Sequence, residues 1–161
     1  TEGATVYTTA GSDEKCAACL DLGADVAINY RDEDWAAVLR EKTEKRGVDV
    51  ILDMVGGDYI QKNIDSLAIE GRLSIIAFLT GAKAELTLSR FMVKRQTMTA
   101  STLRAQSDAA KANIAAELKE RSGHYSPLAG LNRLSTPSLR SQMPQKHMSA
   151  WNLVVISARL S

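Results

Sequence analysis

The chain has 161 residues, of which 45% are hydrophobic and 24% charged, and its net charge is +1. This length corresponds to about one domain, and the near-neutral charge gives no argument for binding nucleic acid or an anionic membrane. No apolar run approaches the ~20 residues of a membrane span. We expect a cytoplasmic protein, because there is no signal peptide and the cysteines are few.

Strands and helices alternate along the predicted chain. Residue patterns and turn signals predict five strands, over Ala4–Thr9, Val26–Asn29, Val48–Asp53, Arg72–Phe78 and Gln96–Thr102. They predict helices over Asp13–Leu22, Asp34–Lys45, Asp58–Leu67, Leu88–Lys94 and Asp108–Arg121. Ser12 and Ser107 are the expected N-caps of the first and last helices. This alternation is typical of an α/β fold with a parallel, doubly wound sheet.

Cys16 and Cys19 form a C-x-x-C pair within the first helix. A redox or zinc site is one interpretation. However, the chain has no second cysteine pair, and no apolar strand leads directly into the motif as in thioredoxin-like sites. We therefore favour two small apolar residues that pack on a buried helix face.

The stretch Leu22–Gly57 carries the clearest βαβ pattern. LGADVAINY and GVDVILDMVGG each enter a short apolar strand through Gly-x-Asp, with one helix between them. Ligands of open α/β sheets bind at the carboxyl ends of the strands. Asp53–Gly57 therefore marks a predicted binding edge, although the glycine-rich phosphate loop expected before this stretch is not in the chain.

The composition changes after Arg121. All 19 acidic residues precede it, and residues 122–161 contain none. A disordered basic tail is one explanation. We favour a shifted reading frame. Synonymous codons can be chosen for this tail so that the same DNA, read one base earlier, encodes a helix-strand-helix-strand pattern that contains acidic residues again. We expect a partial dinucleotide-binding domain over 1–121 and an out-of-frame, irregular tail over 122–161, in which the apolar run Leu153–Ile156 packs at most opportunistically.

Several segments in order resemble the quinone oxidoreductase (zeta-crystallin-like) branch of the medium-chain dehydrogenase/reductases. They are TTAGSDEK, LGADVAINY, GVDVILDMVGGDY, LAIEGRLSIIAFLTG and KRQTMTASTLR. The resemblance as a whole runs across Ala4–Arg121. The resemblance implies a partial Rossmann fold that starts at family strand 2, with strand order 3-2-gap-4-5-6. The family's strand 1, its G-x-G-x-x-G-like turn and most of its catalytic domain are missing.

An open central position in the sheet is energetically costly. It leaves roughly ten backbone groups without partners, at ~1–3 kcal/mol for each one buried. We therefore expect the isolated chain to be unstable unless the neighbouring strands close up or another chain fills the gap.

The resemblance implies NADP(H) as the cofactor. No carboxylate stands at the tip of the first strand, where an NAD-preferring domain places one for the ribose hydroxyls. Ser12, Lys15 and Tyr30 match family positions around the 2′-phosphate of NADPH. Their alternative roles are a helix N-cap, a solvated lysine and a strand-end aromatic residue.

Two further segments are expected to line the cofactor cleft. Asp53, Val55 and Gly56 should lie on the ribose and pyrophosphate side, and the alternative is a simple strand-to-helix turn. Phe78 and Leu79 match the segment that approaches the nicotinamide. Ala77 replaces the family's usual Gly there.

The implied reaction of the full-length family is hydride transfer from NADPH to a quinone or an activated enone. We assign no catalytic residue and no metal site to this chain, and expect it to be inactive alone. Two alternatives remain, a non-catalytic nucleotide-binding or structural module and an enoyl reductase module of a larger synthase. The resemblance also implies a homodimer through the edge strand Gln96–Thr102.

Overall fold

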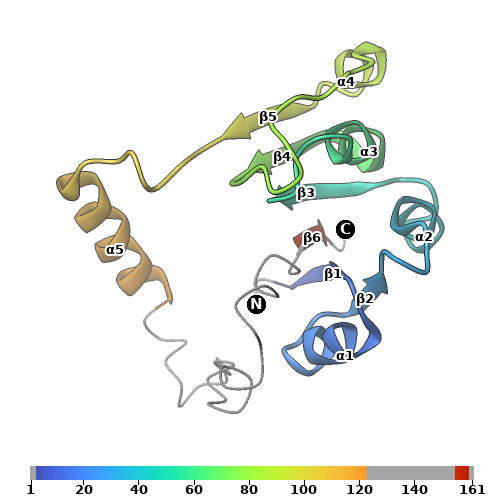
Figure 1. The fold of residues 1–161 in the computed structure, drawn as a ribbon, viewed down its shortest axis with the longest axis horizontal. Coiled ribbons are helices and arrows are strands. Elements are labelled where there is room, and N and C mark those ends of the chain that lie inside the picture. The colour runs from blue at the N-terminus through green and yellow to red at the C-terminus, as the bar shows by residue number, and fades with distance from the viewer. Residues whose placement is uncertain (1–2, 123–154, 160–161) are drawn as a thin grey trace. The chain divides into compact units, whose positions relative to one another are not determined.

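A computed structural model describes residues 3–122 and 155–159 of the chain (Figure 1). The chain divides into two compact units. The first comprises Thr1–Ser101 and Ser149–Ser161, and the second comprises Thr102–Met148. The first unit carries the sheet and every predicted cofactor-site residue.

The elements agree closely with the sequence patterns. The strands are β1 (Ala4–Ala10), β2 (Val26–Asn29), β3 (Val48–Asp53), β4 (Leu67–Ile75), β5 (Thr97–Ala100) and β6 (Val155–Arg159). The helices are α1 (Asp13–Asp21), α2 (Trp35–Lys42), α3 (Tyr59–Ser66), α4 (Ser89–Val93) and α5 (Asp108–Ser122). The predicted α/β class is confirmed.

The sheet has six strands in the order β2-β1-β6-β3-β4-β5. β1 pairs with β2, β3 with β4, and β4 with β5, all in parallel. These five strands follow the predicted relative order. The predicted gap between β1 and β3 is wrong, because β6 lies there (Figure 1).

β6 runs antiparallel to both of its neighbours. It pairs with β1 over Ala4–Thr8 and with β3 over Val50–Leu52. Two facing strand edges with free N–H and C=O groups are a template for a further strand. The sequence pattern gave the tail no structural role, so this closure of the sheet by the chain itself was missed.

β4 begins at Leu67, earlier than the predicted Arg72. Leu67 lies opposite Val48, and the register then shifts before Val50 pairs with Arg72. Glu70 takes up the extra length with a positive φ of 61°. The irregularity hides the start of the strand from a period-two pattern.

The core lies between β2, β3 and β4 on one side and α2 and α3 on the other. Its largest fully buried apolar side chains are Trp35, Ile28, Leu39, Ile51, Ile64, Leu67, Leu73, Val48 and Val55. Trp35 at the start of α2 stacks on Tyr59 at the start of α3, with 5.6 Å between ring centroids. This contact joins the two helices directly behind the carboxyl edge of the sheet.

The second unit contains α5. The Ser107 hydroxyl accepts the Ala110 N–H at 3.2 Å, which confirms the predicted N-cap. Among the described residues, no helix combines the length and the apolar character that a bilayer span requires.

Candidate functional site

The carboxyl ends of β1 and β2 bring Gly11 and Tyr30 together. The Tyr30 N–H donates to the Ala10 carbonyl at 3.0 Å, so the strand pairing continues past β2. A Cβ on Gly11 would lie 2.6 Å from the Tyr30 hydroxyl and 3.4 Å from Arg31 Nε. The absence of a side chain at Gly11 therefore lets the Tyr30 hydroxyl lie against the turn that leads into α1, with Arg31 Nε nearby.

Ser12 follows directly and caps α1. Its hydroxyl oxygen accepts the Lys15 N–H at 3.4 Å, which confirms the N-cap interpretation. Ser12 and Lys15 are both half-buried at this helix start. A helix N-terminus directs unsatisfied N–H groups outward and favours an anion there.

The nearest carboxylate of α1 is engaged locally. Asp13 accepts a hydrogen bond from the Asn29 side-chain amide at 2.8 Å. Glu14 is exposed in the same helical turn. The tip of β1 itself carries no carboxylate, as the sequence indicated.

Asp53 at the end of β3 is fully buried. One carboxylate oxygen accepts the Val55 N–H at 2.8 Å and the other accepts the Gly56 N–H at 3.2 Å. Burial raises the pKa of this carboxyl above its ordinary value, and these two hydrogen bonds oppose the shift. In this geometry Asp53 holds the turn between β3 and α3, which is the alternative role considered above. The neighbouring Val55 is also fully buried.

The backbone of Gly56 is covered by the segment that follows β4. Gly56 has a φ of 73°, and a Cβ there would lie 2.7 Å from the Gly81 carbonyl oxygen and 2.9 Å from Phe78 Cδ1. The Thr80 hydroxyl donates to the Val55 carbonyl at 3.0 Å. The group that lies close to Gly56, and that requires a glycine there, is thus another segment of the same chain.

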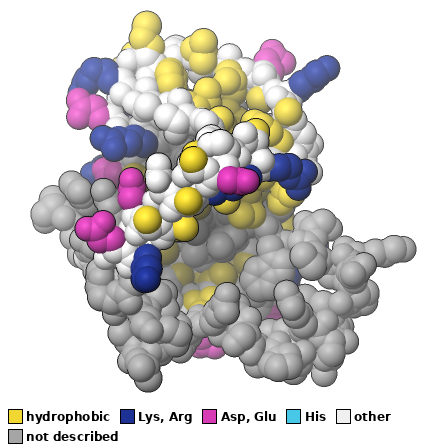
Figure 2. All heavy atoms as spheres, turned by 90° about the vertical axis from the view of Figure 1, so that its left-hand side faces the viewer, with side chains coloured by type: hydrophobic (Ala, Val, Ile, Leu, Met, Phe, Trp, Pro, Cys, Tyr) yellow, Lys and Arg dark blue, Asp and Glu magenta, His cyan; other side chains and the backbone are white. Residues whose placement is uncertain are grey.

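Phe78 and Leu79 remain accessible beyond β4, with 48% and 52% of their surfaces exposed. The neighbouring Ile76 is 41% exposed. The carboxyl ends of β4 and β5 point to the left in Figure 1 and toward the viewer in Figure 2, where hydrophobic side chains gather in the upper part. This edge therefore presents an apolar surface of the kind that a planar ring contacts.

Tyr59 lies at the start of α3, where it stacks on Trp35 and packs, like Tyr30, against the buried core. Burial raises the pKa of its hydroxyl, Tyr30 and Asp53 raise it further, and a hydrogen bond with Trp35 opposes the shift.

A family model described as "Zinc-binding dehydrogenase" matches residues 1–118. The chain belongs to this family. It is 35% identical over 91 residues to quinone oxidoreductase-like protein 2 of Bos taurus, which covers 56% of the chain and 26% of the relative. It is 40% identical over 84 residues to prostaglandin reductase-3 of Mus musculus, which covers 52% of the chain and 22% of the relative.

The chain thus spans about a quarter of the length of these curated relatives. The fold is similar to that of Escherichia coli quinone oxidoreductase complexed with NADPH, with a TM-score of 0.62 and 24% identity. That match covers 82% of the chain and 40% of the solved structure. It supports a Rossmann-like arrangement of this member of the zinc-binding dehydrogenase family.

The family description names zinc, but the described residues offer no site for it. No group of three or more His, Cys, Asp or Glu side chains comes together there in a way that could hold a metal ion. Cys16 and Cys19 are free and buried on α1, which confirms their packing role.

Sequence reasoning missed two residues at this edge of the sheet. Arg31 places its Nε near Gly11, and Tyr59 is a half-buried phenol at the start of α3 whose pKa is raised by burial and by Tyr30 and Asp53. A basic residue directly after Tyr30 was a visible signal for the first. For Tyr59 the only signal was its place after the Gly-Gly turn.

Proposed function

We propose that this chain is the NADP(H)-binding part of an oxidoreductase that transfers hydride from NADPH to a quinone or an activated enone. The observation that carries the proposal is the cluster at the carboxyl ends of β1 and β2. Tyr30 and Arg31 lie against the glycine turn at Gly11, and Ser12 and Lys15 belong to the first turn of the helix that follows, with no carboxylate at the strand tip. The similarity to quinone oxidoreductase-like proteins supports the same substrate class.

Each member of this cluster has a distinct role toward the 2′-phosphate. The Arg31 guanidinium offers forked donors that suit phosphate oxygens, and Lys15 adds a point charge. Ser12 and Tyr30 each offer a hydroxyl donor. The missing carboxylate removes the repulsion that a 2′-phosphate meets in an NAD-specific site.

The nicotinamide end rests on the apolar edge. The bound cofactor supplies the hydride, and Phe78 and Leu79 would pack against its ring and keep water away. No side chain of this chain is assigned a catalytic role. We therefore expect the isolated chain to bind cofactor without accelerating quinone reduction.

Fluorescence titration of the full chain with NADPH and with NADH tests the proposal. The wild type should prefer NADPH. A Lys15→Gln/Arg31→Gln variant should lose about tenfold or more of its NADPH affinity, because each charge-assisted hydrogen bond contributes ~1.5–3 kcal/mol. A Lys42→Gln/Lys119→Gln variant removes the same charge elsewhere and should bind normally. Absence of NADPH binding would leave only a structural module, and equal binding of both cofactors would overturn the role of this cluster toward the 2′-phosphate.

We also propose that β5 pairs with its counterpart in a second copy. All four residues of β5 are exposed, and among the described strands β5 pairs only with β4. Large apolar side chains are exposed nearby, including Met92 at 75% and Val93 at 71%. An unpaired edge beside an apolar surface favours association.

A proline on the outer edge tests this dimer. The Ser101 N–H donates to Ile75 of β4, so alternation directs the Met98 N–H away from β4. Met98→Pro removes this outward donor and should shift a dimer to monomer in analytical ultracentrifugation. A wild-type monomer, or a dimer that the proline leaves unchanged, contradicts the proposal.

We further propose that residues 122–161 are translated out of frame. The family match ends at residue 118, close to the change in composition after Arg121. Sequencing the encoding DNA tests this directly. A one-base slip near this point supports the proposal, and in-frame codons that relatives share throughout the tail contradict it.

A further inference from the structure

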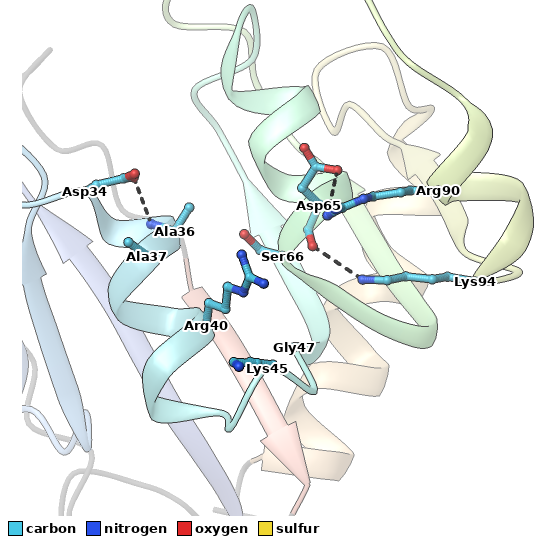
Figure 3. Close-up of a pocket in the computed structure, with 10 residues that line it drawn as sticks. All are labelled: Asp34, Ala36, Ala37, Arg40, Lys45, Gly47, Asp65, Ser66, Arg90 and Lys94. Atoms are coloured by element: carbon cyan, nitrogen blue, oxygen red, sulfur yellow. Dashed lines mark hydrogen bonds and ion pairs between the residues drawn. The ribbon is translucent and has the colours of Figure 1, made fainter.

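A recess outside the proposed cofactor site lies between α2 and the segment that contains α3 and α4 (Figure 3). Its volume is about 490 Å³. It lies wholly within the first unit. The charged side chains that line it are Asp34, Arg40, Lys45, Asp65, Arg90 and Lys94.

Both carboxylates of this recess already have partners. Asp34 accepts the Ala36 N–H at 3.2 Å and lies 3.6 Å from Lys62 Nζ. Asp65 lies 3.5 Å from a guanidinium nitrogen of Arg90. The acidic side chains therefore do not neutralise the remaining cations of the recess.

Lys94 is held in place at the inner wall. Its Nζ donates to the Leu67 carbonyl at 2.5 Å and to the Asp65 carbonyl at 3.3 Å. Burial lowers the pKa of this ammonium group, Arg90 lowers it further, and Asp65 opposes the shift. Lys94 is therefore a partly desolvated cation at the wall of the recess.

Arg40 and Lys45 supply two more cations. Both are exposed, and neither makes a side-chain hydrogen bond or ion pair with any residue in the described ranges. Figure 3 shows the Arg40 side chain extending from α2 toward Ser66 on the opposite wall. Two cations without partners among the described residues thus line the same recess as the ammonium group that the backbone holds in place.

We propose that this recess binds a small molecule through a phosphate or pyrophosphate group. The Arg40 guanidinium can engage two phosphate oxygens in parallel, while Lys45 and Lys94 provide point charges. The Ser66 hydroxyl can donate a further hydrogen bond. This site is independent of the cofactor cluster at Gly11.

Isothermal titration of the full chain with inorganic pyrophosphate, at constant ionic strength, tests the proposal. The wild type should bind one equivalent. Arg40→Gln/Lys45→Gln should weaken binding about tenfold or more. The charge-matched control Lys42→Gln/Lys119→Gln, whose lysines do not line the recess, should bind as the wild type does.

Two further measurements test where pyrophosphate binds and whether the recess prefers phosphate over other anions. Lys15→Gln/Arg31→Gln should bind pyrophosphate normally, and a loss there would place the anion at the cofactor cluster and overturn the proposal. Citrate, a compact anion without phosphate, should bind distinctly more weakly. Equal binding of citrate, equal losses in all variants or no saturable binding would each overturn it. An NMR titration of the Lys94 ammonium group should give a higher pKa for this group with pyrophosphate bound than without it.

Discussion

Proline at Ile156 should destabilise the sheet, because β6 closes it from the centre. Val6 donates its N–H to Asp25 and accepts the Asp25 N–H, at 2.7 and 2.9 Å, so its backbone groups face β2. Alternation then directs the N–H and C=O of Tyr7 toward β6, where Tyr7 lies opposite Ile156. Ile156→Pro removes the N–H that donates to the Tyr7 carbonyl.

The magnitude follows from the burial of Tyr7. Only 7% of Tyr7 is exposed, so water cannot easily replace the lost donor. An unsatisfied buried carbonyl costs ~1–3 kcal/mol, and the proline ring adds steric conflict in a central strand. Against a typical stability of ~5–15 kcal/mol, this loss should be plainly visible.

Urea denaturation followed by circular dichroism measures the effect, with Ile156→Ala as the matched control. The alanine variant shortens the same side chain but keeps the backbone donor. The proline variant should unfold at a clearly lower urea concentration than the alanine variant. Equal midpoints, together with rapid exchange of the Tyr7 amide hydrogen in the wild type, would show that β6 does not hold the sheet.

Three further changes test the site and the core. Gly56→Ala should destabilise the protein by at least about 1–2 kcal/mol in thermal melts. A side chain at positive φ is strained, and its Cβ would collide with Gly81 and Phe78. A melting temperature equal to that of the wild type would contradict this close approach. Asp53 has a folded-state pKa above 3.8, so its contribution to stability is greatest below that pH and is lost as the pH rises through the folded-state pKa. The unfolding free energy of the wild type relative to Asp53→Asn should therefore fall over this window, and a flat difference would refute the burial argument. Trp35→Ala should cost about 3–5 kcal/mol, since Trp35 is only 2% exposed, and a loss below that of a surface substitution would place it outside the core.

The helices and strands that were predicted correctly are those in which the residue pattern of the segment itself determines the structure. Alternating apolar strands and capped helices gave β2 and β3 with their observed bounds, and Ser12 and Ser107 cap the predicted helices. The start of β4 was missed, because Glu70 at positive φ shifts the register and breaks the period. Local pattern rules carry no information about such an irregularity.

The place of β6 could not be predicted for a different reason. Its position depends on two distant edges, β1 and β3, that need partners at the same time. In the site, residue type alone could not separate Asp53 as a ligand from Asp53 as the acceptor of two backbone N–H groups. The distinction depends on burial and on the path of the segment after β4, which are tertiary properties.

Phosphorus NMR of NADP⁺ bound to the full chain tests the central claim most directly. The 2′-phosphate has its own resonance, and the pyrophosphate resonances of the same molecule serve as an internal reference. Contact with Lys15 and Arg31 should lower the pKa of the bound 2′-phosphate, because nearby cations favour its dianion. The Lys15→Gln/Arg31→Gln variant should return this pKa to its value in free NADP⁺. A 2′-phosphate that titrates as in free NADP⁺ when the cofactor is bound to the wild type would contradict the assignment of this cluster to NADP(H).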